Sequence, residues 1–267
     1  MPNLQAISRE SHASKRWQRP SSYAFGAADS FVPLAAVELP KAVMSLPICF
    51  MERADNFILV ALLSLQPGKN LFVAPDGRWA GPYIPAAFRA YPFRLAQTED
   101  KQHVLCVDED SGFVTEGPTG ENFFTEDGEP SQAVLDIFTL LKQIEQSGLA
   151  TVAACAALHQ HKLIRPWPIT VKAESGDQKI AGLFQVDEAA LNELSGEALL
   201  ELRQPGALLL AYCQLLSMQH LPLLGELTGA HAKVAARAEA AKNLTARKEL
   251  DMALFDKGGT FRFGNLR

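Results

Sequence analysis

The sequence has no apolar run long enough to cross a membrane. Its two most hydrophobic stretches, FILVALLSL (57–65) and GALLLAYCQLL (206–216), fall short of the ~20 residues that a transmembrane helix requires. The first twenty residues are polar and lack the apolar core of a secretory signal. We therefore expect no membrane span.

The sequence also lacks closely spaced cysteines. Each of its four cysteines lies alone inside an apolar stretch, far from the others: Cys49, Cys106, Cys155 and Cys213. No pair has the spacing of a zinc site or of a redox motif. Because a free cysteine behaves as a small core residue, we expect buried, reduced thiols in a cytoplasmic protein.

An excess of positive charge is missing as well. The net charge is −5, whereas a nucleic-acid-binding protein normally carries a broad basic face. We expect no nucleic-acid partner. Of the 267 residues, 48% are hydrophobic and 21% charged, which is enough apolar material for a real core, in one large domain or two small ones.

The usual signatures of catalysis are absent too. There is no G-x-S-x-G motif, and QPGKN (66–70) lacks the glycine spacing of a phosphate-binding loop. His159 and His161 are two residues apart, and metal-binding histidines on a helix are usually four apart. The acidic run 108–112 lacks the later ligands of a calcium loop. We predict no catalytic residue, metal ligand or cofactor, and leave enzymatic activity open.

What is present predicts an α+β fold, with a small, mostly antiparallel sheet covered by helices and a C-terminal helical extension. Apolar runs between turn residues predict strands near 47–51, 57–65, 70–74, 103–107, 167–173 and 179–186. Helical patterns cover 33–44, 131–147, 151–163, 187–203 and 206–220. The expected organisation is a flexible arm (1–20), one domain (21–225) and a helical tail (226–267).

Several boundaries have a local cause. Ser131 and Thr151 are typical helix caps, and Gly148 is expected to end the first of the two helices. Ser175, Gly176 and Asp177 are expected to form the turn of a hairpin. The alanine-rich tail after Gly229 predicts an exposed helix that could mediate self-association, with a flexible end at 258–267.

The segment DGRWAGPYIPAAFRAYPFRL (76–95) is rich in aromatic, basic and proline residues. Pro75, Asp76 and Gly77 predict a turn, and Pro85 and Pro92 bracket a two-turn helix. Guanidinium groups bind carboxylates or phosphates, and aromatic rings offer flat apolar area. We therefore predict that this segment binds a peptide or an acidic ligand through six residues: Arg78, Trp79, Tyr83, Arg89, Tyr91 and Arg94.

An equally physical alternative is that the same segment is a packed corner of the core. Arg89 and Arg94 would then pair with Asp108, Glu109 or Asp110, at the end of the strand predicted near 103–107, while the aromatic rings are buried.

Six stretches together resemble, in order, the bacterial SapC-like family, which takes its name from a gene cluster for a surface protein layer. They are SFVPLAAVELPKAVMSLPICF, VALLSLQPGKNLFV, DGRWAGPYIPAAFRAYPFRL, VLCVDEDSGFV, NFFTEDGEPS and AGLFQVDEAALNEL. The resemblance runs from about Tyr23 to Leu224 and leaves out the tail. The family is unrelated to the peptide-transport permease of similar name.

The resemblance implies no catalytic residues. Relatives are associated with surface-layer genes, or with halogenase-like and cupin-like genes, which implies an accessory role in handling or modifying an exported protein or peptide. Many relatives have a histidine where this chain has Phe31, so a scheme that requires that histidine does not fit here.

Two hypotheses about function follow. The first is a non-enzymatic accessory protein that recognises a peptide or protein partner through the 76–95 segment. The second is an enzyme, metal-dependent in one form, whose site is assembled from separated His and Asp/Glu residues.

Overall fold

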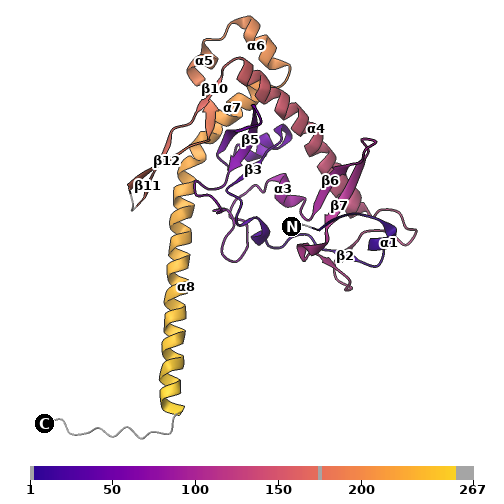
Figure 1. Cartoon of the computed structure of the whole chain (residues 1–267), viewed down its shortest axis with the longest axis vertical. Coiled ribbons are helices and arrows are strands. Elements are labelled where there is room, and N and C mark those ends of the chain that lie inside the picture. The colour runs from indigo at the N-terminus through magenta and orange to yellow at the C-terminus, as the bar shows by residue number, and fades with distance from the viewer. Residues whose placement is uncertain (1–2, 174–175, 257–267) are drawn as a thin grey trace, which may run out of the picture. The chain divides into compact units, whose positions relative to one another are not determined.

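The computed structural model describes residues 3–173 and 176–256. The chain forms two compact units, Met1–Leu224 and Gly225–Arg267. The division falls one residue before the limit of 225 that the sequence suggested. The fold is α+β, as predicted, with small antiparallel sheets and a long C-terminal helix (Figure 1).

The largest sheet has five strands in the order β10-β13-β4-β5-β3, and each neighbouring pair is antiparallel. The strands are β3 (Phe31–Pro33), β4 (Ile48–Arg53), β5 (Asn56–Leu62), β10 (Ile164–Pro166) and β13 (Phe184–Val186). Ala54 and Asp55 have positive φ and make the two-residue turn between β4 and β5. The apolar run in β5 is buried, because helices pack against the sheet.

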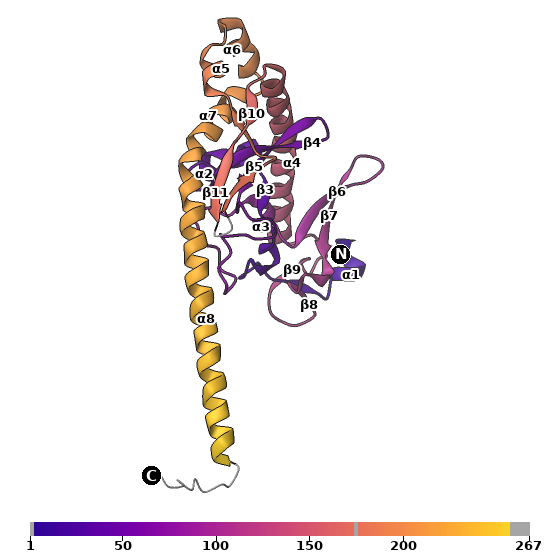
Figure 2. The same cartoon turned by 60° about the vertical axis from the view of Figure 1, so that its left-hand side comes forward.

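A second core lies beside the sheet β1-β7-β6, formed by β1 (Leu4–Ala6), β6 (Phe93–Gln97) and β7 (His103–Asp108). A smaller sheet pairs β2 (Arg16–Trp17) with β8 (Val114–Thr115) and β9 (Glu121–Asn122). One apolar cluster joins these elements to a helix: Trp17, Phe93, Val107, Phe123, Val134 and Ile137. Figure 2 shows β6 and β7 side by side.

The expected loose arm at 1–20 is therefore wrong for residues 3–20. β1 adds a strand to β7, and helix α1 (Arg9–His12) follows it. The His12 side chain is fully buried, with Nε2 2.8 Å from Glu109 Oε1. The stretch is polar and basic in composition, which led to the wrong prediction. Two of its side chains, His12 and Trp17, are nevertheless buried and hold it to the second core.

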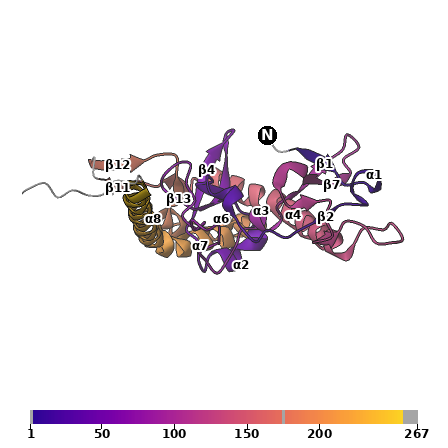
Figure 3. The same cartoon turned by 90° about the horizontal axis from the view of Figure 1, so that it is seen from below.

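Helix α4 (Gln132–Gln160) is continuous, whereas two helices divided at Gly148 were predicted. A glycine inside a helix costs about 1 kcal/mol relative to alanine, and tertiary packing outweighs that cost. The N-terminal half of α4 packs in the second core through Val134 and Ile137. Its C-terminal half buries Cys155 and Leu158 beside the five-stranded sheet (Figures 1 and 3).

The caps of α4 show one correct prediction and one error. Ser131 accepts a hydrogen bond from the Val134 amide, as expected of an N-cap residue. Thr151 lies inside the helix and donates to the Ser147 carbonyl. Its hydroxyl also accepts a hydrogen bond from the Ala36 amide, so it joins α4 to a neighbouring turn.

Other predicted elements are shorter than expected. The region 33–44 contains a 3-10 helix, η2 (Ala36–Glu38), followed by α2 (Leu39–Ala42). The region 70–74 forms only an isolated bridge from Val73 to Trp79. The strand predicted at 179–186 is interrupted at Gly182, which has φ +82°. Its first residues belong to β12 (Gly176–Ile180) and its last to β13.

The remaining described elements follow in chain order. They are η1 (Ala24–Gly26), α3 (Ala86–Arg89), η3 (Glu109–Ser111), β11 (Ile169–Ala173), β12 (Gly176–Ile180), α5 (Glu188–Asn192), α6 (Gly196–Arg203), α7 (Ala207–Ser217), η4 (Met218–His220) and α8 (Leu221–Asp256). β11 and β12 pair as the predicted hairpin. Ser175 and the end at 258–267 lie outside the described residues.

The helical stretch Ala207–Thr245 is long and apolar enough to cross a membrane by length and composition. In its most apolar window, 39% is buried inside the protein, and the buried part includes Leu210 and Ala211 of α7. Core helices of soluble proteins meet the same criterion, so the absence of a membrane span stays a prediction.

Replacing Trp17 with alanine tests whether residues 3–20 belong to the domain. Trp17 is 1% exposed and its ring meets Phe93 edge-on, so the change leaves a large cavity. We expect the free energy of unfolding to fall by about 3–5 kcal/mol in urea denaturation. The control is Arg9→Ala, which removes an exposed ion pair with Glu129 and should cost less than about 1 kcal/mol. Equal stability of the two variants would contradict an integrated N-terminus.

Candidate functional site

The 76–95 segment folds as a tight turn, a short helix and the start of a strand. The predicted turn is confirmed: the Gly77 amide donates to the Ala74 carbonyl, and Gly77 has φ +84°. Helix α3 begins directly after Pro85 and ends at Arg89, and β6 begins after the cis Tyr91–Pro92 bond. The prolines therefore limit α3 to one turn rather than the two that were expected.

Most aromatic rings of this segment belong to the core. Tyr83 is 7% exposed, and Phe88 and Phe93 are also buried. Trp79 stacks on Phe72 with ring centroids 5.4 Å apart, and its indole Nε1 donates to the Tyr83 carbonyl at 2.8 Å. To this extent the segment is the packed corner that we gave as the alternative.

Buried Glu38, in η2, holds the segment in place. Its carboxylate accepts hydrogen bonds from the Tyr83 hydroxyl at 2.7 Å, the Ala86 amide at 2.7 Å and the Ala35 amide at 3.0 Å. Burial, and secondarily the Glu38 carboxylate, hold the pKa of Tyr83 well above its usual range, so Tyr83 stays a hydrogen-bond donor. Glu38 thus joins α3 to the turn that precedes α2.

Two of the three arginines have partners inside the protein. Arg78 is exposed and pairs with Asp76 at 2.7 Å. Arg89 donates through Nε to the Ile84 carbonyl at 3.0 Å, and its guanidinium lies 5.6 Å from the centre of the Tyr83 ring. Both arginines are exposed, and among the described residues Arg89 forms no ion pair with Asp108, Glu109 or Asp110, the partners expected in the alternative.

Arg94 differs from the other two. Its side chain is exposed, and within residues 3–173 and 176–256 it forms no ion pair. Two of the three acidic residues proposed as its partners, Asp108 and Glu109, are engaged elsewhere. Glu109 lies 2.7 Å from Lys15, and Asp108 accepts hydrogen bonds from the Asn3 and Asp110 amides. A guanidinium is therefore available to a ligand at the start of β6.

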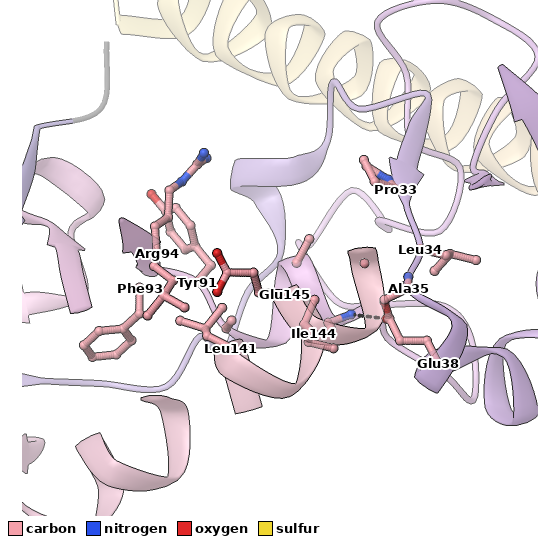
Figure 4. A pocket seen from close by; sticks show the side chains of 15 residues that line it. Pro33, Leu34, Ala35, Glu38, Tyr91, Phe93, Arg94, Leu141, Ile144 and Glu145 are labelled. Carbon is pink, nitrogen blue, oxygen red and sulfur yellow. Dashed lines mark hydrogen bonds between the residues drawn. The ribbon is translucent and has the colours of Figure 1, made fainter. Parts of the chain in front are cut away.

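Arg94 lies where two hollows meet. The first hollow has a volume of about 570 Å³ and the second about 590 Å³. Both are lined by Pro33, Ala87, Tyr91 and Arg94, so the two hollows adjoin, and together they are called the cleft. In Figure 4, Arg94 and Tyr91 lie at one end of the first hollow and Pro33 and Leu34 at the other.

The walls of the cleft come from rigid elements. α4 contributes Leu141, Ile144 and Glu145 to the first hollow, as Figure 4 shows. Glu145 Oε2 lies 2.6 Å from His103 Nε2, which ties α4 to the β6–β7 hairpin. On the other side the Ala36 and Val37 amides donate to Thr151 and Ser147 of α4. These contacts fix α4 relative to both sheets that border the cleft.

The second hollow is aromatic and acidic. Tyr91 stacks on Phe25 with centroids 4.0 Å apart, and its hydroxyl lies 3.4 Å from Asp108 Oδ2. Burial, followed by the charge of Asp108, raises the pKa of Tyr91. Burial also raises the pKa of Asp29, and the nearby Arg94 opposes that rise. The remaining carboxylate of this hollow is Asp110.

The structure thus divides the six predicted ligand residues. Tyr91 and Arg94 line the cleft, whereas Tyr83 is buried in the core and the half-buried Trp79 donates a hydrogen bond to the Tyr83 carbonyl. Arg78 and Arg89 line neither hollow. Residues from other parts of the chain were missed, among them Asp29, Glu38 and Glu145, because no local motif marks them and only the fold brings them to residues 87–95. Phe31 also lines the second hollow.

The histidine pair and the four cysteines line neither hollow of the cleft. The His159 ring packs on Phe57, and His161 Nε2 lies 3.1 Å from Glu201. Across the described part of the chain, no three His, Cys, Asp or Glu side chains are close enough to hold a metal ion. All four cysteines are buried and reduced, and burial raises the pKa of Cys49 and of Cys155 to about 12.

A comparison with known protein families supports the resemblance noted in the sequence. The model of the SapC family matches residues 7–224, which includes every residue of the cleft and most of the N-terminal stretch. No curated protein and no solved structure is significantly similar to the chain.

Replacing Glu38 with glutamine tests its role as the anchor of the site. The amide would turn an NH₂ group toward donors that now face a carboxylate, leaving at least one buried donor without an acceptor. We expect the free energy of unfolding to fall by about 2 kcal/mol or more in urea denaturation. The matched control is Glu52→Gln, an exposed carboxylate at the end of β4, which should change stability by less than about 0.5 kcal/mol. A loss no greater than that of the control would show that Glu38 is not an anchor.

Proposed function

Since the chain belongs to the SapC family, we propose that it is a non-enzymatic accessory protein that binds a peptide, or an exposed segment of a protein partner, in the cleft beside α3 and β6. The observation that carries this proposal is a two-part cleft with a guanidinium at its junction, that of Arg94, which forms no ion pair with any residue that the structure describes. Within this proposal, the protein acts in a cytoplasmic step of a surface-protein or peptide-modification system.

The dimensions of the cleft support a peptide ligand. Each hollow falls within the 300–1,000 Å³ that ligand pockets usually have, and their shared lining residues place them next to each other. A chain that passes from one hollow to the other can insert a side chain into each. Arg94, between them, can donate hydrogen bonds to main-chain carbonyl oxygens of the ligand.

The preformed walls support binding without a large conformational change. α4 is held to η2 by two hydrogen bonds and to the β6–β7 hairpin through Glu145 and His103. Glu38 fixes α3 by its bonds to Tyr83 and Ala86. A rigid site loses little conformational entropy when a ligand binds.

Binding is favoured over catalysis by the chemistry of the described residues. The thiols of Cys49 and Cys155 are buried with raised pKa values, so they are poor nucleophiles. Glu145 contacts a histidine, His103, but among the described residues that line the cleft there is no cysteine or serine that could complete a nucleophile and base pair.

Two substitutions of residues that line both hollows test the cleft. Ala87 is exposed on α3 and lines both hollows, so Ala87→Trp should fill the junction. A library of displayed random peptides, twelve residues long, is selected for binding to the immobilised full-length chain. The peptides that bind most tightly are then labelled, and their affinities are measured by fluorescence anisotropy. We expect Ala87→Trp to abolish binding and Arg94→Ala to weaken it about 10- to 100-fold.

Arg78→Ala is the control, because this exposed arginine lies outside the cleft and pairs only with Asp76 among the described residues. It should bind as the unmodified protein does. Peptides that bind Ala87→Trp with unchanged affinity, or a selection that enriches nothing, would contradict the proposed function.

We also propose that α8 mediates self-association. Val234 and Leu244 are exposed on this alanine-rich helix, and a long helix with apolar side chains on its surface gains stability by packing against a second copy. For the 29.1 kDa chain, light scattering should give about twice the monomer mass. Truncation after residue 228, or Val234→Lys with Leu244→Lys in the full chain, should restore the monomer. If the unmodified chain, the truncated chain and the double lysine variant all have the same oligomeric state, α8 does not mediate self-association.

A further inference from the structure

The two hollows of the cleft differ in chemistry. The first is lined mainly by aliphatic groups, among them Leu34, Leu95, Leu141 and Ile144. Its two carboxylates are already engaged, since Glu38 accepts three hydrogen bonds and Glu145 lies against His103. This hollow therefore suits an apolar side chain, which gains about 25 cal/mol for each Å² of apolar surface removed from water.

The second hollow carries an excess of negative charge. Asp29, Asp108 and Asp110 line it, and Arg94 is the one cationic side chain among its lining residues in the described part of the chain. Three carboxylates and one guanidinium leave a charge of −2. The Asp29 and Asp110 carboxylates form no ion pair within residues 3–173 and 176–256. An anionic ligand would be repelled here, and a cationic one would be attracted.

Aromatic rings in the same hollow favour the same kind of group. Tyr91 and Phe25 are stacked, and Phe31 is 40% exposed. Lysine and arginine side chains combine a long aliphatic stem with a charged head, so the stem can lie on the rings while the head reaches the carboxylates. The face of an aromatic ring also attracts a cation directly.

From these two chemistries we infer that the ligand is an extended peptide in which an aliphatic side chain enters the first hollow while a neighbouring lysine or arginine enters the second. This inference rests on the proposed function and adds the charge of the ligand. It replaces the acidic ligand that the arginine-rich sequence suggested, because Arg78 and Arg89 lie outside the cleft.

The same peptide selection tests the inference. We expect enriched peptides to pair a leucine, isoleucine, valine or methionine with a nearby lysine or arginine. In the tightest peptide, replacing the basic residue with norleucine keeps the stem and removes the charge. Anisotropy should then show affinity at least ~10-fold weaker, and replacement with glutamate should weaken it further.

A double variant, Asp29→Asn with Asp110→Asn, identifies where the charge acts. Against it the lysine and norleucine peptides should bind with affinities within about 3-fold of each other. The matched control, Glu126→Gln with Asp127→Asn, removes two exposed carboxylates outside the cleft and should keep the full preference for lysine. Circular dichroism spectra of both variants, compared with that of the unmodified protein, check that the substitutions leave the chain folded.

The outcomes separate the two proposals. Peptides that Ala87→Trp excludes, but that lack a basic residue or bind equally well as norleucine forms, would overturn the inference and leave the cleft as a binding site. A preference for lysine that survives in the Asp29→Asn, Asp110→Asn variant would also overturn it. If no peptide binds in a way that depends on Ala87, both proposals fail.

Discussion

The site depends on the buried carboxylate of Glu38. A buried charge is stable only when its oxygens are well hydrogen-bonded, and here three donors from two separate stretches of chain satisfy them. One donor is the Tyr83 hydroxyl, so a ring that looked like part of a binding surface is instead a structural partner. By fixing α3, Glu38 determines where Ala87 and Tyr91 meet the cleft. It also determines the position of Arg94, which follows Tyr91 by three residues in β6.

Helix α4 supplies the second constraint. It passes from the core around Trp17 to the five-stranded sheet, and it is held to η2 and to the β6–β7 hairpin along the way. These contacts of α4 fix the position of the β6–β7 hairpin relative to η2 and the five-stranded sheet. A cleft that is built on one long helix needs no separate closing step to acquire its shape, which agrees with a role in recognition.

Local sequence signals were enough to predict the fold class and many of the elements. The apolar run that forms β5, the Ser131 cap and the turn at Gly77 were predicted correctly, because each depends on adjacent residues. The errors have a common cause in tertiary contacts. Gly148 does not end α4 because both halves are packed, and residues 3–20 are ordered because His12 and Trp17 are buried. The site was predicted only where it is contiguous, at Tyr91 and Arg94; Asp29 and Glu145 reach it from distant segments.

The glycine in the middle of α4 shows how folding and recognition compete within one helix. Gly148 lines the first hollow, and a Cβ built there would meet no other atom within 4 Å. Alanine would therefore fit and would favour the helix by about 1 kcal/mol. Each larger side chain would take volume from the first hollow, so in the proposed binding mode the size of this residue would limit the aliphatic group that fits there.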